Sequence, residues 1–391
     1  MKECNFLIGT LSGGGAERVV SNLSLNFDPS IKKNIILFGD YSITYPYEGN
    51  LEVLDKNDIT KKKIITKIST LFKRMKSLKK VKEKKTTISF LEYPNLMNCL
   101  TNNNNNKTIV SVRNHMTTKH KQGLKSIFWK QTIKHLYPKT DLIVACSKEI
   151  KKDLVINYKI PDDKIKVIYN SYDLREINLL KKEEIEKQYE NIFEYPVIIS
   201  SGRLSKQKGF EYLIRSFYYA LQKSPNLKLV ILGEGPEEKK LKNLVNTLGI
   251  KSSVFFLGFQ VNPFKYIYHS KIYVQTSIFE GFPNALCEAM ACGIPVISTD
   301  CLSGPREILA PTEFEASTLN YDINIDRNGI LIPNFESEVK DIEQLEKECA
   351  TKMLELLSDC KVYNCFREKS EKRVKDFDIK KLISEWESLI V

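Results

Sequence analysis

The chain has 391 residues, and 42% of them are apolar, which is enough to bury the cores of two domains rather than one. It holds no apolar run of eighteen residues, so the sequence predicts no transmembrane helix, and the first apolar stretch reads as a strand rather than a secretory signal. The net charge of +12 is uneven: residues 1–180 hold 32 Lys and Arg against 17 Asp and Glu, whereas residues 181–391 carry −3. This excess predicts an anionic partner for the N-terminal half alone.

Short apolar runs alternate with helical patterns along the first half. The predicted strands are 5–10, 34–39, 86–92, 108–113, 141–147 and 164–170. Alternation of this kind is typical of a parallel sheet covered by helices on both faces.

A charged stretch at 175–194 then predicts a connector, and the pattern restarts after it. The predicted strands of the second half are 196–202, 227–233, 253–258, 271–277 and 294–299, followed by helical sequence from about 338 to 391. We therefore expect an α/β protein with two doubly wound, Rossmann-like domains facing across a cleft. Its parts would be an N-terminal domain at 1–180, a C-terminal domain at 181–375 and a last helix at 376–391 that packs back on the first domain.

The nine cysteines are scattered, odd in number and form no Cys-x-x-Cys pair. This usage favours reduced thiols in a cytoplasmic protein over disulfides or a zinc site.

Two loops that follow predicted strands carry residues suited to phosphates. In LSGGGAERVV, Gly14 and Gly15 open a helix, where backbone N–H groups and the positive helix end favour an anion. In SGRLSKQKGF, Arg203 and Lys208 both follow a strand, and two cations there suit a diphosphate.

The stretch EGFPNALCEAMACG places Glu280 and Glu288 eight residues apart. The residues after Glu280 do not continue a helix, so we expect α-helix to begin at 283–284, with Glu280 in the loop before it and Glu288 in its second turn. Carboxylates in such a pocket can accept hydrogen bonds from vicinal sugar hydroxyls. The intervening residues, whose backbone lines the same helix N-terminus, are Gly281, Phe282, Pro283 and Asn284.

The pattern Glu280-Gly-Phe-Pro-Asn-x-x-x-Glu288 resembles the E-x7-E motif of retaining glycosyltransferase family four, whose members have the GT-B fold. The resemblance extends, in the right order over nearly the whole chain, to Gly13–Val19, Ser201–Gly209, Leu232–Pro236 and Ala289–Ile297. Within that family the chain is most similar to bacterial enzymes that extend lipid-diphosphate-linked glycans of O-antigen, capsule or glycoproteins.

The resemblance implies a role for each of these residues. Arg203 and Lys208 would bind the donor diphosphate, Glu288 the ribose hydroxyls, and Glu280 with the backbone of residues 281–284 the donor sugar. The expected donor is a UDP-sugar, with GalNAc, GlcNAc or galactose as the sugar, and the expected acceptor is a glycan on a polyprenyl diphosphate.

The resemblance also assigns residues outside these loops. Gly14 and Gly15 would lie near the donor phosphates and sugar, Phe259 near the base, and His115 near the reacting centre. The Asp-x-Asp sequence at 376–378 reads as a helix N-cap by Asp378, so we expect no metal and no other cofactor.

Residues 61–85 hold twelve Lys and Arg and one acid, with apolar residues near helical spacing. They predict an amphipathic basic helix, which would either pack on the core or attach the enzyme peripherally to the anionic inner face of the cell membrane.

Three other classes remain open from the sequence. A basic nucleic-acid-binding protein fits the charge, but no nucleic-acid module is legible and we expect no nucleic-acid partner. A glycosidase with Glu280 and Glu288 as its acid pair would leave Arg203 and Lys208 idle. A nucleotide-sugar epimerase can have the same fold, so the fold alone does not distinguish it from a glycosyltransferase.

Overall fold

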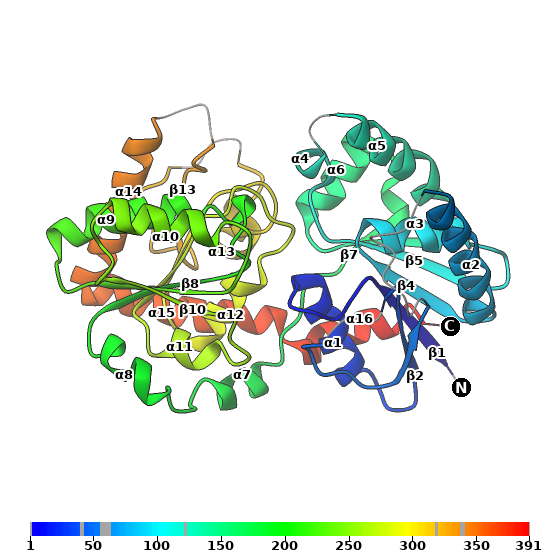
Figure 1. Cartoon of the computed structure of the whole chain (residues 1–391), viewed down its shortest axis with the longest axis horizontal. Coiled ribbons are helices and arrows are strands. Elements are labelled where there is room, and N and C mark those ends of the chain that lie inside the picture. The colour runs from blue at the N-terminus through cyan, green and yellow to red at the C-terminus, as the bar shows by residue number, and fades with distance from the viewer. Residues whose placement is uncertain are drawn as a thin grey trace. The chain divides into compact units, whose positions relative to one another are not determined.

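The computed structural model describes residues 2–39, 43–54, 64–120, 123–316, 320–336 and 341–390. The chain divides into two compact units (Figure 1), one made of Met1–Tyr172 with Phe377–Val391 and the other of Asp173–Asp376. Each unit is built on one all-parallel sheet, so the predicted α/β class with two doubly wound, Rossmann-like domains is confirmed.

The first unit has a seven-stranded sheet in the order β3-β2-β1-β4-β5-β6-β7. Its order reverses direction between β1 and β4, which makes that position the switch point of the sheet. The strands are β1 (Glu3–Ile8), β2 (Lys32–Leu37), β3 (Asn50–Val53), β4 (Thr86–Phe90), β5 (Lys107–Val112), β6 (Leu142–Ala145) and β7 (Ile165–Val167).

Successive residues of β1 point to opposite faces of this sheet, and each face has a core of its own. Phe6 and Ile8 pack with the helices α1 and α16, whereas Leu7 packs with α2 and α3. The helices of this unit are α1 (Gly15–Asn26), α2 (Ile64–Lys82), α3 (Glu92–Leu100), α4 (Met116–Lys119), α5 (Leu124–Leu136), α6 (Lys148–Tyr158) and α16 (Ile379–Glu387).

The second unit has a six-stranded sheet in the order β10-β9-β8-β11-β12-β13, with its switch point between β8 and β11. Its central strands are buried on both sides, which is why they read as continuous apolar runs. The strands are β8 (Val197–Ser201), β9 (Lys228–Leu232), β10 (Val254–Gly258), β11 (Ile272–Gln275), β12 (Val296–Thr299) and β13 (Ile330–Ile332).

The helices of the second unit form two layers. Helix α9 packs with α10 and α14, while α12 packs with α7, α11 and α15. Their bounds are α7 (Leu174–Leu180), α8 (Lys187–Phe193), α9 (Phe210–Lys223), α10 (Glu238–Thr247), α11 (Phe264–Tyr268), α12 (Asn284–Cys292), α13 (Pro305–Leu309), α14 (Ile342–Ser358) and α15 (Cys360–Val374).

The stretch 175–194 is not a connector, and this sequence interpretation was wrong. It forms α7 and α8, and α7 packs on α11 and α12 of the second unit. The Lys181 ammonium also donates to the carbonyl of Ala291 at 3.3 Å. These contacts place the division of the chain at 172/173, whereas the sequence had placed it at 180/181.

The last helix, α16, packs on α1 of the first unit, and Trp386 is buried in the core around Phe6. Where the chain leaves and re-enters that unit, the N–H of Tyr172 donates to the carbonyl of Phe377 at 2.9 Å. Asp378 accepts from the N–H of Lys380 at 3.0 Å, which confirms its reading as the N-cap of α16.

Helix α2 covers most of the stretch predicted at 61–85; residues 61–63, and the side chains up to residue 69, lie outside the described residues. Leu78 is fully buried in the core around Leu7, and Leu71 and Met75 pack against the same core. Leu71, Met75 and Leu78 therefore belong to the core side of the stripe, whereas Phe72 of the same stripe is 65% exposed.

Candidate active site

Two loops meet at the switch point of the second unit. Residues 202–209 follow β8, and residues 276–283 follow β11, its neighbour in the sheet. Open parallel sheets bind ligands at this position, beyond the carboxyl ends of the strands. The sequence-predicted residues Arg203, Lys208 and Glu280 all lie in these two loops.

The two loops approach each other through their backbones, and glycine makes the approach possible. Gly209 has a φ of +61°, and a Cβ built on it would lie 2.2 Å from the carbonyl oxygen of Thr276. Any larger residue would push the loops apart, so Gly209 sets their spacing.

Lys208 and Glu280 form an ion pair in the middle of this arrangement. The Lys208 ammonium lies 2.6 Å from Oε1 of Glu280, and the same oxygen accepts from the Ser277 hydroxyl at 2.6 Å. Burial opposes the charge on Lys208, but Glu280 outweighs it, and the pKa of the lysine is raised above its usual value. The site therefore keeps a positive charge beside a carboxylate at neutral pH.

Three hydrogen bonds, two with Gln207 and one with Asn334, fix the loop that carries Glu280. The N–H of Ile278 donates to the Gln207 carbonyl at 2.8 Å, and the Gln207 side-chain amide donates to the Phe279 carbonyl at 2.9 Å. Asn334, which follows β13, donates to the Ile278 carbonyl at 2.8 Å. Because these bonds involve the backbone of the loop, the position of the Glu280 carboxylate is determined by the fold.

Helix α12 begins at Asn284 with Pro283 as its N-cap, which confirms the helix start predicted at 283–284. Phe282 is buried beneath this turn, and the carbonyl of Gly281 accepts from the Ser303 hydroxyl at 2.6 Å. Glu288 lies in the second turn of α12 and is 9% exposed.

Buried Tyr273 on β11 connects the two ends of the site. Its hydroxyl donates to the carbonyl of Ser201 at 3.2 Å. Burial raises the pKa of Tyr273, while Lys208 lowers it and Glu288 raises it. Lys208 and Glu288 thus both act electrostatically on the buried Tyr273 phenol.

Two residues predicted to bind the donor, Arg203 and Phe259, are exposed to solvent. Arg203 is exposed, and its side chain forms no ion pair with any residue in the described ranges. Phe259 is 42% exposed, and its N–H donates to the Glu234 carboxylate at 3.4 Å. An uncommitted cation and an exposed ring suit contacts with a phosphate and a flat base.

Sequence reasoning missed Ser277, Ser303 and Glu234. The two serines have no sequence signal, because small hydroxyl residues are common in loops and their partners are remote. Glu234 stood within a stretch that carried the family resemblance, Leu232–Pro236, but received no role.

In the first unit, the glycine-rich loop follows β1 at the switch point and ends in α1. Gly13 has a φ of +65°, and a Cβ on Gly14 would lie 2.0 Å from a carboxylate oxygen of Glu17. Glycine at both positions is therefore explained by the conformation and packing of the loop itself, without a ligand. Gly15 is the first residue of α1.

His115 follows β5, is buried, and caps α4. Its Nδ1 accepts from the N–H of Thr118 at 3.3 Å and lies 3.7 Å from a carboxylate oxygen of Asp153. When Nδ1 acts as the acceptor, the proton is on Nε2, and that N–H can donate to a ligand hydroxyl. A role for His115, Gly14 and Gly15 at the donor stays a prediction.

The described ranges contain neither a helix long and apolar enough to cross a bilayer nor a group of three His, Cys, Asp or Glu side chains placed to hold a metal ion.

Family models match most of the chain. Residues 181–371 match the family described as Glycosyl transferases group 1, and residues 95–176 match Glycosyltransferase Family 4. The two matches fall largely within the second and the first unit, respectively.

Curated relatives agree with the models. The chain is 39% identical over 295 residues to an uncharacterized glycosyltransferase of Methanocaldococcus jannaschii, covering 73% of this chain and 72% of that protein. It is 32% identical over 385 residues to the N-acetylgalactosamine-N,N'-diacetylbacillosaminyl-diphospho-undecaprenol 4-alpha-N-acetylgalactosaminyltransferase of Campylobacter jejuni. That match covers 97% of this chain and 96% of the relative.

Solved structures share the fold at low identity. HepE of Anabaena, in complex with UDP and glucose, has a TM-score of 0.77 at 18% identity and 99% coverage of both chains. Sucrose-phosphate synthase of Thermosynechococcus elongatus has a TM-score of 0.72 at 15% identity, covering 100% of this chain and 98% of that one. The fold is therefore the α/β GT-B fold, as expected. The chain belongs to the GT-B glycosyltransferase family.

Proposed function

We propose that this glycosyltransferase transfers a sugar from a UDP-sugar to a glycan carried on a polyprenyl diphosphate, with retention of the anomeric configuration. The observation that carries the proposal is the full-length similarity to the Campylobacter jejuni N-acetylgalactosaminyltransferase, whose name specifies a diphospho-undecaprenol acceptor. A second Campylobacter jejuni α-1,4-N-acetyl-D-galactosaminyltransferase is 25% identical over 397 residues.

GalNAc is the sugar we propose first, and GlcNAc and galactose follow. Similarity to lipopolysaccharide 1,6-galactosyltransferase of Salmonella typhimurium, 32% over 176 residues, supports galactose over part of the chain only. UDP is the nucleotide to test first, since the structural neighbour HepE was crystallised with UDP-glucose.

The geometry of the second unit supports a division of labour. Arg203 and Lys208 supply positive charge for the diphosphate, Glu288 accepts from the ribose hydroxyls, and Phe259 lies against the base. Glu280, already held by Lys208 and Ser277, accepts from the donor sugar together with the backbone of residues 281–284. Gly14, Gly15 and His115 remain further candidates for donor contacts.

Retention follows most simply from attack on the face that the leaving group departs from. The acceptor hydroxyl forms the new glycosidic bond as the bond to the diphosphate breaks, and a departing phosphate oxygen takes the hydroxyl proton. Charge grows on that phosphate in the transition state, where Lys208 and Arg203 stabilise it. This proposal assigns the electrostatic work to side chains, without a metal.

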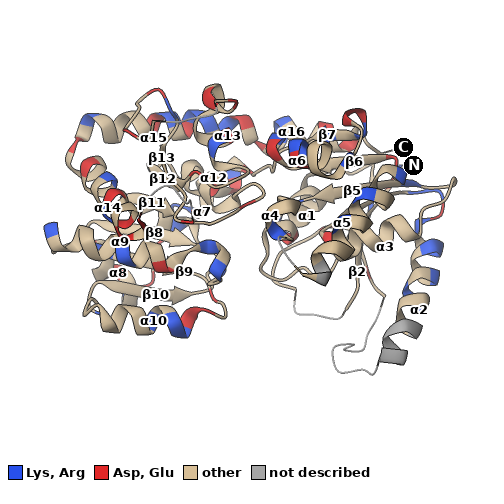
Figure 2. Cartoon of the chain, turned by 90° about the horizontal axis from the view of Figure 1, so that it is seen from above, with Lys and Arg blue, Asp and Glu red and all other residues tan. Residues whose placement is uncertain are grey.

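A polyprenyl-linked acceptor stays in its bilayer, so we propose that the enzyme works peripherally at the inner face of the cell membrane. Figure 2 shows Lys and Arg positions spaced along α2. The lysines at 73, 76, 79 and 80 are exposed, whereas Arg74 donates to the carbonyl of Phe38 and stacks over that ring. The exposed lysines, with no acid in the helix, would meet anionic headgroups.

A donor screen tests the function directly. UDP-GalNAc, UDP-GlcNAc and UDP-galactose should each be incubated with the protein, with thermal shift and slow hydrolysis as readouts and GDP-mannose as control. We expect one UDP-sugar to stabilise the protein and to be hydrolysed equally with and without EDTA. No response to any UDP-sugar would contradict the proposed donor, and EDTA sensitivity would contradict the metal-free mechanism. Conversion of the sugar without an acceptor would indicate an epimerase.

A further inference from the structure

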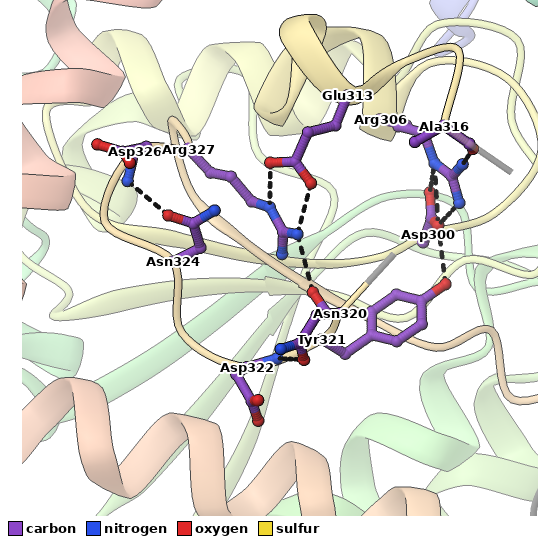
Figure 3. Close-up of polar contacts among 10 residues, drawn as sticks. All are labelled: Asp300, Arg306, Glu313, Ala316, Asn320, Tyr321, Asp322, Asn324, Asp326 and Arg327. Carbon is purple, nitrogen blue, oxygen red and sulfur yellow. Dashed lines mark hydrogen bonds and ion pairs between the residues drawn. The ribbon is translucent and has the colours of Figure 1, made fainter. Parts of the chain in front are cut away.

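A polar network of Asp300, Arg306 and Tyr321 begins where β12 ends, and Figure 3 shows its contacts. Nε of Arg306 is 3.1 Å from both carboxylate oxygens of Asp300, and the Tyr321 hydroxyl donates to Oδ2 of Asp300 at 2.9 Å. The Asp300 side chain is only 3% exposed. Arg306 also donates to the carbonyl of Ala316 at 2.9 Å. Because Arg306 and Tyr321 both donate to this buried carboxylate, the position of Asp300 is well defined.

The Asp300–Arg306 pair closes a tight turn that has unusual backbone angles. Ser303 has a φ of +71°, which is uncommon outside glycine, and Gly304 has a φ of +99°. Residues in such conformations persist only where their surroundings hold them. The pair joins the two ends of this turn, because Asp300 follows β12 and Arg306 lies in α13.

The turn rests directly on the proposed donor-sugar loop. The Ser303 hydroxyl donates to the Gly281 carbonyl at 2.6 Å. A Cβ built on Gly304 would lie 2.4 Å from Cδ of Pro283, the N-cap of α12. A displaced turn would therefore move the backbone between Glu280 and Asn284.

Arg306 and Tyr321 both keep their protons at neutral pH, so both can donate to Asp300. A hydrogen bond with Asp300 raises the pKa of Arg306, and burial followed by the Asp300 charge raises the pKa of Tyr321 to about 12. Arg306 stays charged, and Tyr321 stays a donor.

We propose that Asp300, Arg306 and Tyr321 are positioning residues, which act through the Ser303 hydroxyl to hold the Glu280 loop in the geometry that contacts the donor sugar. This inference rests on the proposed function and adds residues that touch no donor themselves. Its consequence is selective, because it concerns recognition of the sugar and leaves the contacts with uracil, ribose and diphosphate in place.

The chain offers a matched control close by. Arg327 forms the same kind of pair with Glu313, at 2.9 and 2.7 Å, and also donates to the carbonyl of Asn320. Figure 3 shows both pairs. The Arg327 side chain donates to Glu313 and Asn320, and none of these hydrogen bonds goes to the 301–304 turn.

The test compares Arg306→Lys with Arg327→Lys, because lysine keeps the charge in both and loses the guanidinium fork. We expect Arg306→Lys to lower kcat/KM for transfer by roughly tenfold to a hundredfold, as small misplacements of a catalytic loop do. The affinity for UDP alone, measured by calorimetry, should stay within about twofold, while the extra affinity for UDP-sugar falls. Tyr321→Phe should give a milder loss of the same kind, and Arg327→Lys, which meets the network only through Asn320 beside Tyr321, should lose no more than Tyr321→Phe.

A double-mutant cycle tests the route through Ser303. If Arg306 acts through that hydroxyl, adding Ser303→Ala to Arg306→Lys should cost little more than either change alone. Multiplied losses would overturn the inference, as would wild-type kinetics of Arg306→Lys or equal losses in Arg327→Lys. If the wild-type protein binds no UDP-sugar, the proposed donor and this inference both fail. If the wild-type protein binds a UDP-sugar and Arg306→Lys keeps wild-type kinetics, this inference fails and the proposed donor stands.

Discussion

Oε1 of Glu280 accepts hydrogen bonds from the Lys208 ammonium and the Ser277 hydroxyl, both at 2.6 Å. Hydrogen bonds from Gln207 and Asn334 to backbone carbonyls hold the loop that carries Glu280. Such pre-positioned charge favours a transition state whose charge develops in the same place. We therefore predict that Lys208→Ala and Glu288→Ala each lower the transfer rate at least about a hundredfold, near 2.7 kcal/mol of transition-state stabilisation. The measurement is kcat/KM with the UDP-sugar found in the donor screen.

Lys206 provides the control, because it belongs to the same short helical turn as Lys208 but is exposed. Lys206→Ala should keep wild-type kinetics. Wild-type rates in folded Lys208→Ala would show that the ion pair is structural and that the donor site has been placed wrongly.

Glu346 on α14 gives a residue-scale prediction about stability. Its side chain is 4% exposed, and burial raises its pKa to about 7, with a partial offset from Arg215 at 3.7 Å. A carboxyl whose pKa is raised by folding stabilises the folded state fully below its unfolded pKa of about 4.3, and this stabilisation is lost as pH rises through the folded value. The free energy of unfolding should thus fall between pH 4.5 and 7 in wild type, and this fall should be smaller in Glu346→Gln.

Denaturant unfolding at several pH values measures this difference. Glu368→Gln on α15 is the control, since that residue is exposed, and it should keep the wild-type pH dependence. A Glu346→Gln protein with an unchanged slope would mean that Glu346 is ionised in the folded state.

At the scale of elements, the buried strands could be predicted from the sequence, because a parallel strand covered on both faces is a short apolar run. Strands β3 and β13 were missed. Strand β3 at the sheet edge, Asn50–Val53, has only four residues, which are largely exposed and half polar, and β13 has only three residues. The helices α7 and α8 were missed because their sequences are rich in charge and contain few of the apolar residues that pack, in α7 on α12 and in α8 on Tyr266 of α11.

The candidate site could be predicted only in part. Gly281 and Pro283 interrupt the helical pattern between the two glutamates, so the turn before α12 and the start of α12 could be predicted from the sequence. Ser303 and Tyr273 were not visible, because their roles depend on contacts between loops and strands that are distant along the chain. The sequence left open whether the apolar stripe of 61–85 faces the core or lipid, because the two patterns look alike; in the structure, Leu71, Met75 and Leu78 pack on the core.

Helix α2 carries the element-scale prediction. Replacing Lys73, Lys76, Lys79 and Lys80 with Gln should weaken sedimentation with anionic liposomes at low salt, because each exposed cation contributes about 1 kcal/mol near an anionic surface. Hydrolysis of the nucleotide sugar should be unchanged, since these side chains lie in the first unit. Wild-type binding should be released at 1 M salt, where the screening length is about 3 Å.

Arg74 is left intact in that variant, because it bonds to Phe38 and Tyr93 and its loss would disturb the fold. Four exposed lysines of the second unit, Lys206, Lys239, Lys361 and Lys372, give a charge-matched control. If both quadruple variants bind vesicles equally well, α2 has no special part in membrane attachment.

At the scale of the whole molecule, the basic charge and the residues of the proposed donor site are concentrated in different parts of the chain. The basic excess belongs to the N-terminal half, whereas the ion pair and second glutamate of the proposed donor site lie in the second unit. This separation suits an enzyme whose acceptor is anionic and membrane-bound and whose donor is a soluble nucleotide sugar.

The configuration of the product tests this account most directly. The enzyme should be incubated with its UDP-sugar, whose anomeric bond is α, and a polyprenyl-diphosphate-linked glycan, and the anomeric proton of the added sugar should be measured by NMR. We predict that the added sugar is α-linked, because attack on the face of the departing diphosphate keeps the donor configuration. A β-linked product would contradict the proposed mechanism, and the absence of any transfer to the lipid-linked glycan would contradict the proposed acceptor.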